Sequence, residues 1–362
     1  MDRLNYCRGA LMGMAVGDAM GYPVDAKSWE EICQSYGPNG LLGYDLQNDY
    51  ADITSYTQIA AFVANGLLVG ATRARSELYH RYTALAMKEW AKAQQFRGTT
   101  ERTHCWVAQV AALRRRMCMD TRMLDALGRD VLGTPDAPTN TANSPGSITA
   151  AVAVGLFYDP QRMDSRQIGS LAAQAVALTH GNPETILSGA VAAYVVASVL
   201  QDPEKTLPEH LSQSMQNVNR QFCEKFPQAM EAITQKIGQA ISLTRDPELT
   251  PLAAMTLLGC TTASECLAGA VYACMIHPAN FDEAMIVSVN HSGRSSAVGA
   301  LTGAILGAKL GYDALPEFYL ESLEPVDSLE ELARDLTTGR QTTRIFDDSW
   351  DHKYIQGLPI SM

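Results

Sequence analysis

Two aspartates near the N-terminus stand in apolar surroundings and could carry acid–base chemistry. Asp18 lies between Gly17 and Ala19, and Asp25 follows in the same segment. A carboxylate removed from water needs a hydrogen-bonding or charged partner, and one that faces a cleft can act as a general acid or base. Asp18 and Asp25 are therefore the candidate catalytic residues. The structural alternative for Asp18 is a helix cap.

Two further segments, 52–58 and 290–296, place polar side chains directly before apolar, helix-like stretches. The second precedes a Gly- and Ala-rich stretch, so its backbone N–H groups would favour an anion at the start of a helix. An arginine among hydroxyl groups can bind a phosphate or a carboxylate. The candidate ligand-binding side chains in these segments are Thr54, Ser55, Tyr56, Asn290, Arg294, Ser295 and Ser296.

A third polar stretch runs from Gly128 to Gly146 and has the composition of a long loop. Three prolines stand in it among Thr, Asn and Ser residues, a composition typical of turns. Long loops in compact domains often border functional sites. Asn143 within this stretch and Ser147 just after it are further candidate ligand-binding residues.

The elements that must position these side chains are helices. Apolar residues recur at helical spacing, and no alternating stretch rich in Val, Ile, Thr and aromatic residues indicates a sheet. We therefore expect an all-α fold and a single domain over residues 1–362. Gly299, Gly303 and Gly307 would form one stripe that lets a neighbouring helix approach closely. The clearest predicted helices cover Ile168–Leu178, Thr185–Leu200, Ala263–Met275 and Val298–Leu310.

Composition restricts the class of protein. Hydrophobic residues make up 46% of the 362 residues and charged residues 19%, which is enough apolar material for a core. A net charge of −11 argues against nucleic acid as a partner. The sequence has neither a signal-peptide pattern nor a long uninterrupted apolar run, so we expect no membrane association. Eight cysteines without metal-ligand spacing indicate reduced thiols and a cytoplasmic location.

The order of these motifs resembles that of the ADP-ribosylglycohydrolases. The resemblance rests on Met14–Asp25, Thr54–Leu68, Leu178–Pro183 and Val289–Gly311 and runs nearly end to end. It implies a compact orthogonal helical bundle built around two magnesium ions. It also implies an enzyme that removes ADP-ribose or related ribosyl groups from proteins or small molecules. Such a resemblance is specific for fold and much less specific for substrate.

The metal-binding motifs of that family are degenerate in this chain. The family's first motif reads Ser or Thr, Asp, Asp, Thr, Gln, whereas Thr54–Gln58 reads Thr, Ser, Tyr, Thr, Gln. The second reads Gly-Gly-Asp-Ser-Asp-Ser or Thr, and the aligned residues 292–297 contain no acid. Of the six side chains that the resemblance assigns to metal, Thr54 alone remains. Because magnesium requires oxygen ligands, preferably carboxylates, and Arg294 adds a positive charge, we predict that the metal pair is absent and that no cofactor is bound.

The central motif of the family has also changed. Its Asn-x-Ser-Lys-Gly-Cys-Gly stretch corresponds to Asn140–Gly146, and its Met-Arg pair corresponds to Thr149 and Ala150. Asp25 stands where relatives often have Glu. The resemblance therefore implies a cleft whose polar network has been rebuilt. For His180 and His291, which lie in the motifs that resemble the family, we expect structural hydrogen bonds.

One hypothesis is a catalytically impaired protein that binds a ribosyl or nucleotide-like ligand. In it, Arg294 takes over the charge of the metal and contacts a phosphate or carboxylate. The structural alternative is that Arg294 pairs with Asp18, Asp25 or Asp52 and keeps an empty pocket folded, because buried charges must be paired in either case.

Two other functions stay open. A metal-independent or altered-substrate hydrolase of N- or O-glycosidic bonds would use Asp18 or Asp25 as the acid or base, with Arg294 stabilising negative charge. A structural or regulatory protein would instead bind an active paralogue or an ADP-ribosylated protein.

Overall fold

The computed structural model describes residues 2–46, 49–73, 75–95, 103–161, 163–339 and 348–357. Within these ranges the regular elements are helices, and β-pairing is limited to one isolated bridge between Ala51 and Leu323. The predicted all-α class is therefore confirmed. The α-helices are α1 (Arg3–Gly21), α2 (Trp29–Tyr36), α3 (Ser55–Thr72), α4 (Tyr79–Gln95), α5 (Ala111–Arg114), α6 (Arg122–Leu127), α7 (Ile148–Phe157), α8 (Ser165–Ala177), α9 (Pro183–Gln201), α10 (Leu207–Phe222), α11 (Pro227–Leu243), α12 (Pro251–Leu258), α13 (Ala263–Ile276), α14 (Phe281–Val289), α15 (Ser295–Leu310), α16 (Glu317–Glu321), α17 (Val326–Thr338) and α18 (Asp348–Tyr354).

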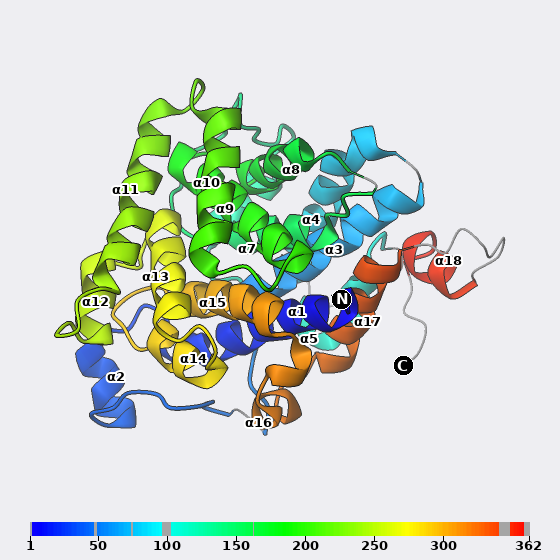
Figure 1. The fold of residues 1–362 in the computed structure, drawn as a ribbon. Helices are drawn as coiled ribbons and strands as arrows, with labels where there is room; N and C mark the ends of the chain where they lie inside the picture. The colour runs from blue at the N-terminus through cyan, green and yellow to red at the C-terminus, as the bar shows by residue number, and fades with distance from the viewer. Residues whose placement is uncertain are drawn as a thin grey trace.

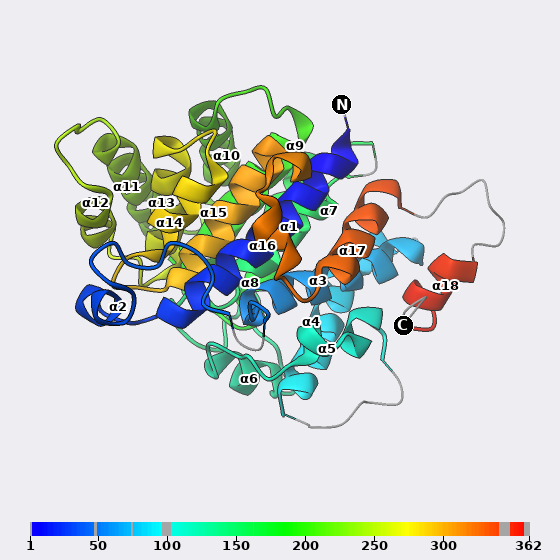
Figure 2. The ribbon, with the colours of Figure 1, turned by 90° about the horizontal axis from the view of Figure 1, so that it is seen from below.

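Helices α1 and α15 lie side by side through the middle of the molecule (Figures 1 and 2). Their glycines face each other in antiparallel register. A Cβ atom added to Gly17 would lie 1.9 Å from the carbonyl oxygen of Gly299, and one added to Gly13 would lie 2.2 Å from that of Gly303. The predicted small-residue stripe is therefore the contact between these two helices. Larger residues there would force the two backbones apart.

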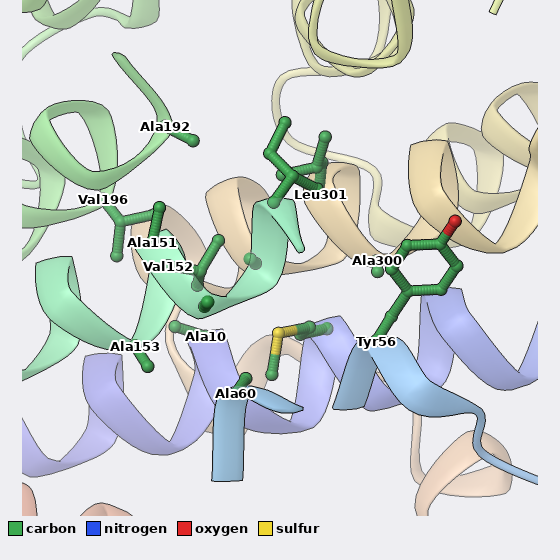
Figure 3. Packing of buried hydrophobic residues seen from close by; sticks show 14 of the residues in the cluster. Ala10, Tyr56, Ala60, Ala151, Val152, Ala153, Ala192, Val196, Ala300 and Leu301 are labelled. Atoms are coloured by element: carbon green, nitrogen blue, oxygen red, sulfur yellow. The ribbon is translucent and has the colours of Figure 1, made fainter. Parts of the chain in front are cut away.

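Apolar helices surround this central pair. Helix α3 contacts α7, α7 contacts α9, and α9 contacts α15, and Figure 3 shows their Ala, Val and Leu side chains meeting in one cluster. Among the described residues, α9 alone is long and apolar enough to cross a membrane, and 83% of that stretch is buried inside the protein. A helix that is apolar on all sides is expected in a protein core.

The predicted helices are present with small shifts at their ends. Helices α8, α9, α13 and α15 contain the four predicted stretches, apart from Leu178 at the end of the first. The region 128–146 contains no helix, as predicted, and lies between α6 and α7. The segment 115–121 joins α5 to α6 and touches the beginning of α3, which matters for the candidate site.

Candidate ligand-binding site

Asp18 is a fully bonded carboxylate that joins α1 to α3. It is fully buried and accepts hydrogen bonds from both the backbone N–H and the hydroxyl of Thr54, at 2.8 and 2.6 Å. Thr57 donates the same two kinds of bond, at 3.0 and 2.6 Å. Burial raises the pKa of Asp18 to about 6, although these four hydrogen bonds act to lower it. Asp18 therefore caps a helix, as the structural alternative held, but the helix is the neighbouring α3 rather than its own.

Asp25 lies at the other end of the same segment, where the chain leaves α1 and meets the start of α15. Its side chain is 2% exposed and accepts a hydrogen bond of 3.0 Å from the backbone N–H of Ser296. The Nη1 atom of Arg294 lies 3.5 Å from its second oxygen. Burial raises the pKa of Asp25, and Arg294 and the Ser296 N–H oppose that rise. Of the three aspartates considered as partners for Arg294, Asp25 is the one that it contacts.

The guanidinium of Arg294 is only partly satisfied by the protein. Its Nη2 atom donates to the carbonyl oxygen of Met119 at 3.3 Å, and its side chain is 25% exposed. Its Nε atom and the Tyr56 hydroxyl are both buried and meet no strict hydrogen-bond geometry in the described part of the chain. The phenol and the guanidinium nevertheless interact with each other, because each shifts the pKa of the other. Figure 3 shows Tyr56 extending from the start of α3 past Ala300, with its hydroxyl directed away from the apolar cluster. Burial and then Asp25 raise the pKa of Tyr56 well above its usual range, whereas Arg294 lowers it, so the phenol is a neutral donor beside the guanidinium.

Several predicted ligand-binding side chains bond to nearby backbone instead. Ser55 accepts from the Met119 N–H at 3.1 Å, and the Ser295 hydroxyl donates to Val289 at 2.8 Å. Ser296 donates to the Asp18 carbonyl at 3.3 Å. The Asn290 amide both donates to and accepts from the backbone of residue 41, at 2.8 Å in each case. In the described structure these side chains hold loops against helix ends, and Thr54 holds Asp18.

A second polar cluster, which the sequence analysis missed, centres on Asp120. Arg122 donates to both of its oxygens, at 2.9 and 2.8 Å, and the Ser144 hydroxyl donates to it as well. His180 Nε2 lies 3.4 Å from the carboxylate. Burial raises the pKa of Asp120, but hydrogen bonds from His180, Arg122 and Ser144 outweigh burial and lower it overall. The sequence held one local signal for this cluster, the Asp-x-Arg stretch just before a helix. The other members, Ser144 and His180, lie far along the chain.

The remaining predicted residues flank this second cluster. Asn143 is exposed, and its carbonyl oxygen accepts from Ala263 at 2.9 Å. Ser147 is buried and contacts His180 Nδ1 at 2.9 Å. His180 and His291 both make hydrogen bonds, the latter to the Ser288 carbonyl at 3.0 Å. The Met119–Asp120 segment connects the two clusters, because Arg294 bonds to Met119.

An open pocket of about 610 Å³ lies against the segment that joins Asp18 to Asp25. Ala19 and Pro23 in its wall are sequence neighbours of Asp18 and Asp25, and Asp52, which also lines it, pairs with Arg115 and not with Arg294. Its full lining is Ala19, Tyr22, Pro23, Lys27, Tyr36, Asp45 and Asp52.

The family model for ADP-ribosylglycohydrolase matches residues 1–345. The chain belongs to the ADP-ribosylglycohydrolase family. An uncharacterized protein of Archaeoglobus fulgidus is 25% identical to it over 335 residues, which cover 91% of this chain and 95% of that protein. A solved structure described as an ADP-ribosylglycohydrolase-related protein complex is 20% identical, with a TM-score of 0.53 over 92% of this chain and 98% of that chain. The latter likeness supports the fold alone.

Proposed function

We propose that this member of the ADP-ribosylglycohydrolase family binds a ribosyl or ADP-ribose-like ligand without the family's magnesium pair and without its usual catalysis. The observation that carries the proposal lies at the Asp25 end of α1. Arg294 Nε and the Tyr56 hydroxyl are buried there side chain against side chain, and among the described residues neither has a further hydrogen-bond partner. Buried polar groups are normally hydrogen-bonded. Two of them beside a partly satisfied guanidinium favour a site that a polar ligand atom or a water completes.

The chemistry of the donor set does not fit a magnesium pair. At the positions aligned with the family's metal-binding acids stand hydroxyl groups and the Arg294 guanidinium, and the Thr54 hydroxyl is committed to Asp18. Within the described ranges, no group of three or more His, Cys, Asp or Glu side chains could hold a metal ion. Magnesium prefers carboxylate oxygens, and a fixed guanidinium would repel it. We therefore derive no step through a metal.

Arg294 supplies charge to the ligand in this proposal, while Asp25 holds Arg294 in place. Two of its donor atoms face Asp25 and Met119, and Nε has no partner of its own in the described part of the chain. A phosphate or carboxylate oxygen that accepts from Nε and from the Tyr56 phenol would form charge-assisted hydrogen bonds, which are stronger than neutral ones. The ligand is a free ribosyl compound, or the same group attached to a protein.

Calorimetric titration of ADP-ribose into chelator-treated protein tests the proposal. We expect saturable binding, at least a tenfold weakening in Arg294→Ala, and a smaller loss in Tyr56→Phe. Arg8→Ala is the matched control, because Arg8 is 27% exposed and pairs with Glu330 as Arg294 pairs with Asp25. The absence of binding, or equal binding by Arg294→Ala and wild type, would contradict the proposal.

A metal-independent glycosidase is the second candidate, and its acid would be Asp25 rather than Asp18. Burial raises the pKa of both carboxyl groups, as a general acid requires. The oxygens of Asp18 are occupied by the four donors of Thr54 and Thr57, whereas Asp25 accepts one backbone N–H and lies 3.5 Å from Arg294. Release of ADP-ribose from ADP-ribosylated substrates in chelator, abolished by Asp25→Asn, would establish this activity. A complete lack of turnover with those substrates would exclude it.

A further inference from the structure

Exposed apolar side chains gather where the chain passes from α2 toward α3. Eight large hydrophobic side chains are exposed in the described part of the chain, and five of them lie in or beside this stretch. They are Leu42, Leu46 and Tyr50, together with Tyr22 at the end of α1 and Phe318 on α16. Single exposed apolar side chains are normal, but a cluster of them typically marks an interaction surface.

Contacts with α16 hold this stretch in place. The Ala51 N–H donates to the Ser322 carbonyl, just after α16, at 2.8 Å. The Tyr44 ring packs edge-on against Tyr319 with 5.1 Å between centroids, and Tyr319 packs against Phe318 at 4.3 Å. Figure 1 shows this part of the chain passing from α2 toward α16. The stretch is therefore anchored, although its other large apolar side chains stay exposed.

The open pocket of about 610 Å³ adjoins the same stretch, because Asp45 and Asp52 form part of its wall. Tyr22 and Tyr36 add two aromatic rings, and Lys27 is the one cation in the lining. The Tyr36 hydroxyl donates to Asp45 at 2.6 Å, which fixes that carboxylate in the wall. Carboxylates beside aromatic rings are suited to bind a cationic side chain.

The surface around this pocket is strongly acidic. Residues 22–52 and 312–327, the two stretches that meet here, contain eleven acidic residues and one basic residue. Arg115 pairs with both Asp52 and Glu324, so the acids still outnumber the cations. A concentration of one charge attracts a partner of opposite charge, and it repels nucleic acid, anionic membranes and a second copy of the same surface.

We propose that Leu42, Leu46, Tyr50, Phe318 and the adjoining pocket form a docking surface for a basic segment of another protein. Apolar side chains of that segment pack on the exposed leucines and aromatic rings, and one of its lysine or arginine side chains enters the pocket. The apolar contacts supply affinity, while the acidic residues attract the partner and select for it. This role goes beyond the proposed ligand site.

Fluorescence anisotropy with a labelled peptide that alternates arginine and leucine tests the proposal on the full chain. We expect saturable binding that is at least threefold weaker in Leu42→Ser. Leu257→Ser is the matched control, because both leucines are 57% exposed and Leu257 lies on α12, outside the residues that form the docking surface. It should bind as wild type does. A lack of binding, or equal weakening in the two variants, would overturn the proposal.

Two pairs of glutamates test the contribution of local charge. Glu317→Gln with Glu321→Gln removes two charges from α16, and Glu224→Gln with Glu248→Gln removes two charges elsewhere; all four residues are exposed. The first pair should weaken binding at least threefold at low salt, with a smaller difference at high salt, because salt screens exposed charges. The second pair should have no effect. Equal weakening would mean that net charge alone attracts the peptide, which would overturn the proposal.

Two further measurements separate this role from self-association and from the proposed function. Sedimentation should give the same mass for wild type and Leu42→Ser, since like charges oppose pairing of two copies. A dimer that Leu42→Ser dissociates would assign the surface to a second copy and overturn the proposal. Arg294→Ala should bind the peptide as wild type does, so peptide binding and ADP-ribose binding can fail independently.

Discussion

Asp18 and Asp25 stand at the two ends of one short segment, and their buried carboxylates differ in how completely the protein hydrogen-bonds them. Asp18 meets four donors from the start of α3. Asp25 meets one backbone N–H and an arginine 3.5 Å away. The Nε atom of that arginine and the neighbouring Tyr56 hydroxyl face each other's side chains and have no further partner among the described residues. The first arrangement is complete and stabilises the fold. The second has hydrogen-bonding capacity left over, so we place the ligand there.

The largest loss of stability is expected at Asp18, whose hydrogen bonds are complete. Asp18→Ala would leave four buried donors without an acceptor, and disrupting a buried network of this kind costs roughly 4 kcal/mol of unfolding free energy. Asp52→Ala breaks a partly exposed pair with Arg115 and should cost no more than about 1 kcal/mol. Urea unfolding at pH 7 measures both. Equal losses would mean that the Asp18 network is no more important than a surface ion pair.

Both ends depend on the close contact between α1 and α15. In Gly303→Ala the new methyl group would lie 1.8 Å from the Gly13 carbonyl oxygen, so the helices must separate at a cost of about 3 kcal/mol. In Gly238→Ala, on α11, the methyl group meets open space, and the change should stabilise the protein by roughly 0.5–1 kcal/mol. Thermal unfolding compares the two. A neutral Gly303→Ala would show that the helices are not in backbone contact.

Asp18 and His291, two buried groups that ionise with opposite charges, should respond to pH with opposite signs. Burial raises the pKa of Asp18 from 3.8 to about 6, so its contribution to stability falls as pH rises through that interval. Burial lowers the pKa of His291, just before Arg294, from 6.5 to about 4, so its contribution falls as pH drops from 6.5 toward 4. Between pH 4.5 and 7 each contribution changes by about 2 kcal/mol.

Single variants separate the pH-dependent contributions of Asp18 and His291 to stability. Relative to wild type, Asp18→Asn should gain stability and His291→Asn should lose stability on going from pH 4.5 to pH 7, because each removes one titrating group. Urea midpoints at both pH values give the slopes. Parallel slopes in all three proteins would show that neither group titrates as its burial predicts.

The last comparison deletes one hydroxyl beside Asp18 and one beside Arg294 and measures the change in stability. Thr57→Val removes the 2.6 Å bond to Asp18 and should cost roughly 1.5–3 kcal/mol, as expected for a hydrogen bond to a charged group. Tyr56→Phe removes a hydroxyl that faces the guanidinium and has no further partner among the described residues, and it should change stability by less than about 0.5 kcal/mol. If Tyr56→Phe is the costlier change, the Arg294 end is already complete in the free protein.

The helices and the glycine stripe could be predicted because they depend on local periodicity. Asp25 was among the expected partners of Arg294 because opposite buried charges pair. The roles of Ser55, Ser295 and Asn290 could not be predicted, because short polar side chains can turn to nearby backbone groups as readily as to a ligand. The Asp120 cluster was missed because it joins three segments distant in the chain, and only the packed fold shows that they meet.

Thermal unfolding of chelator-treated protein with magnesium, with ADP-ribose and with both tests the central claim most directly. A ligand that binds only the folded state raises the unfolding midpoint by mass action. We predict a rise with ADP-ribose alone, no rise with magnesium, and no further rise when magnesium is added to ADP-ribose. A magnesium-dependent rise, or a response to ADP-ribose that requires magnesium, would contradict the claim that Arg294 has replaced the metal.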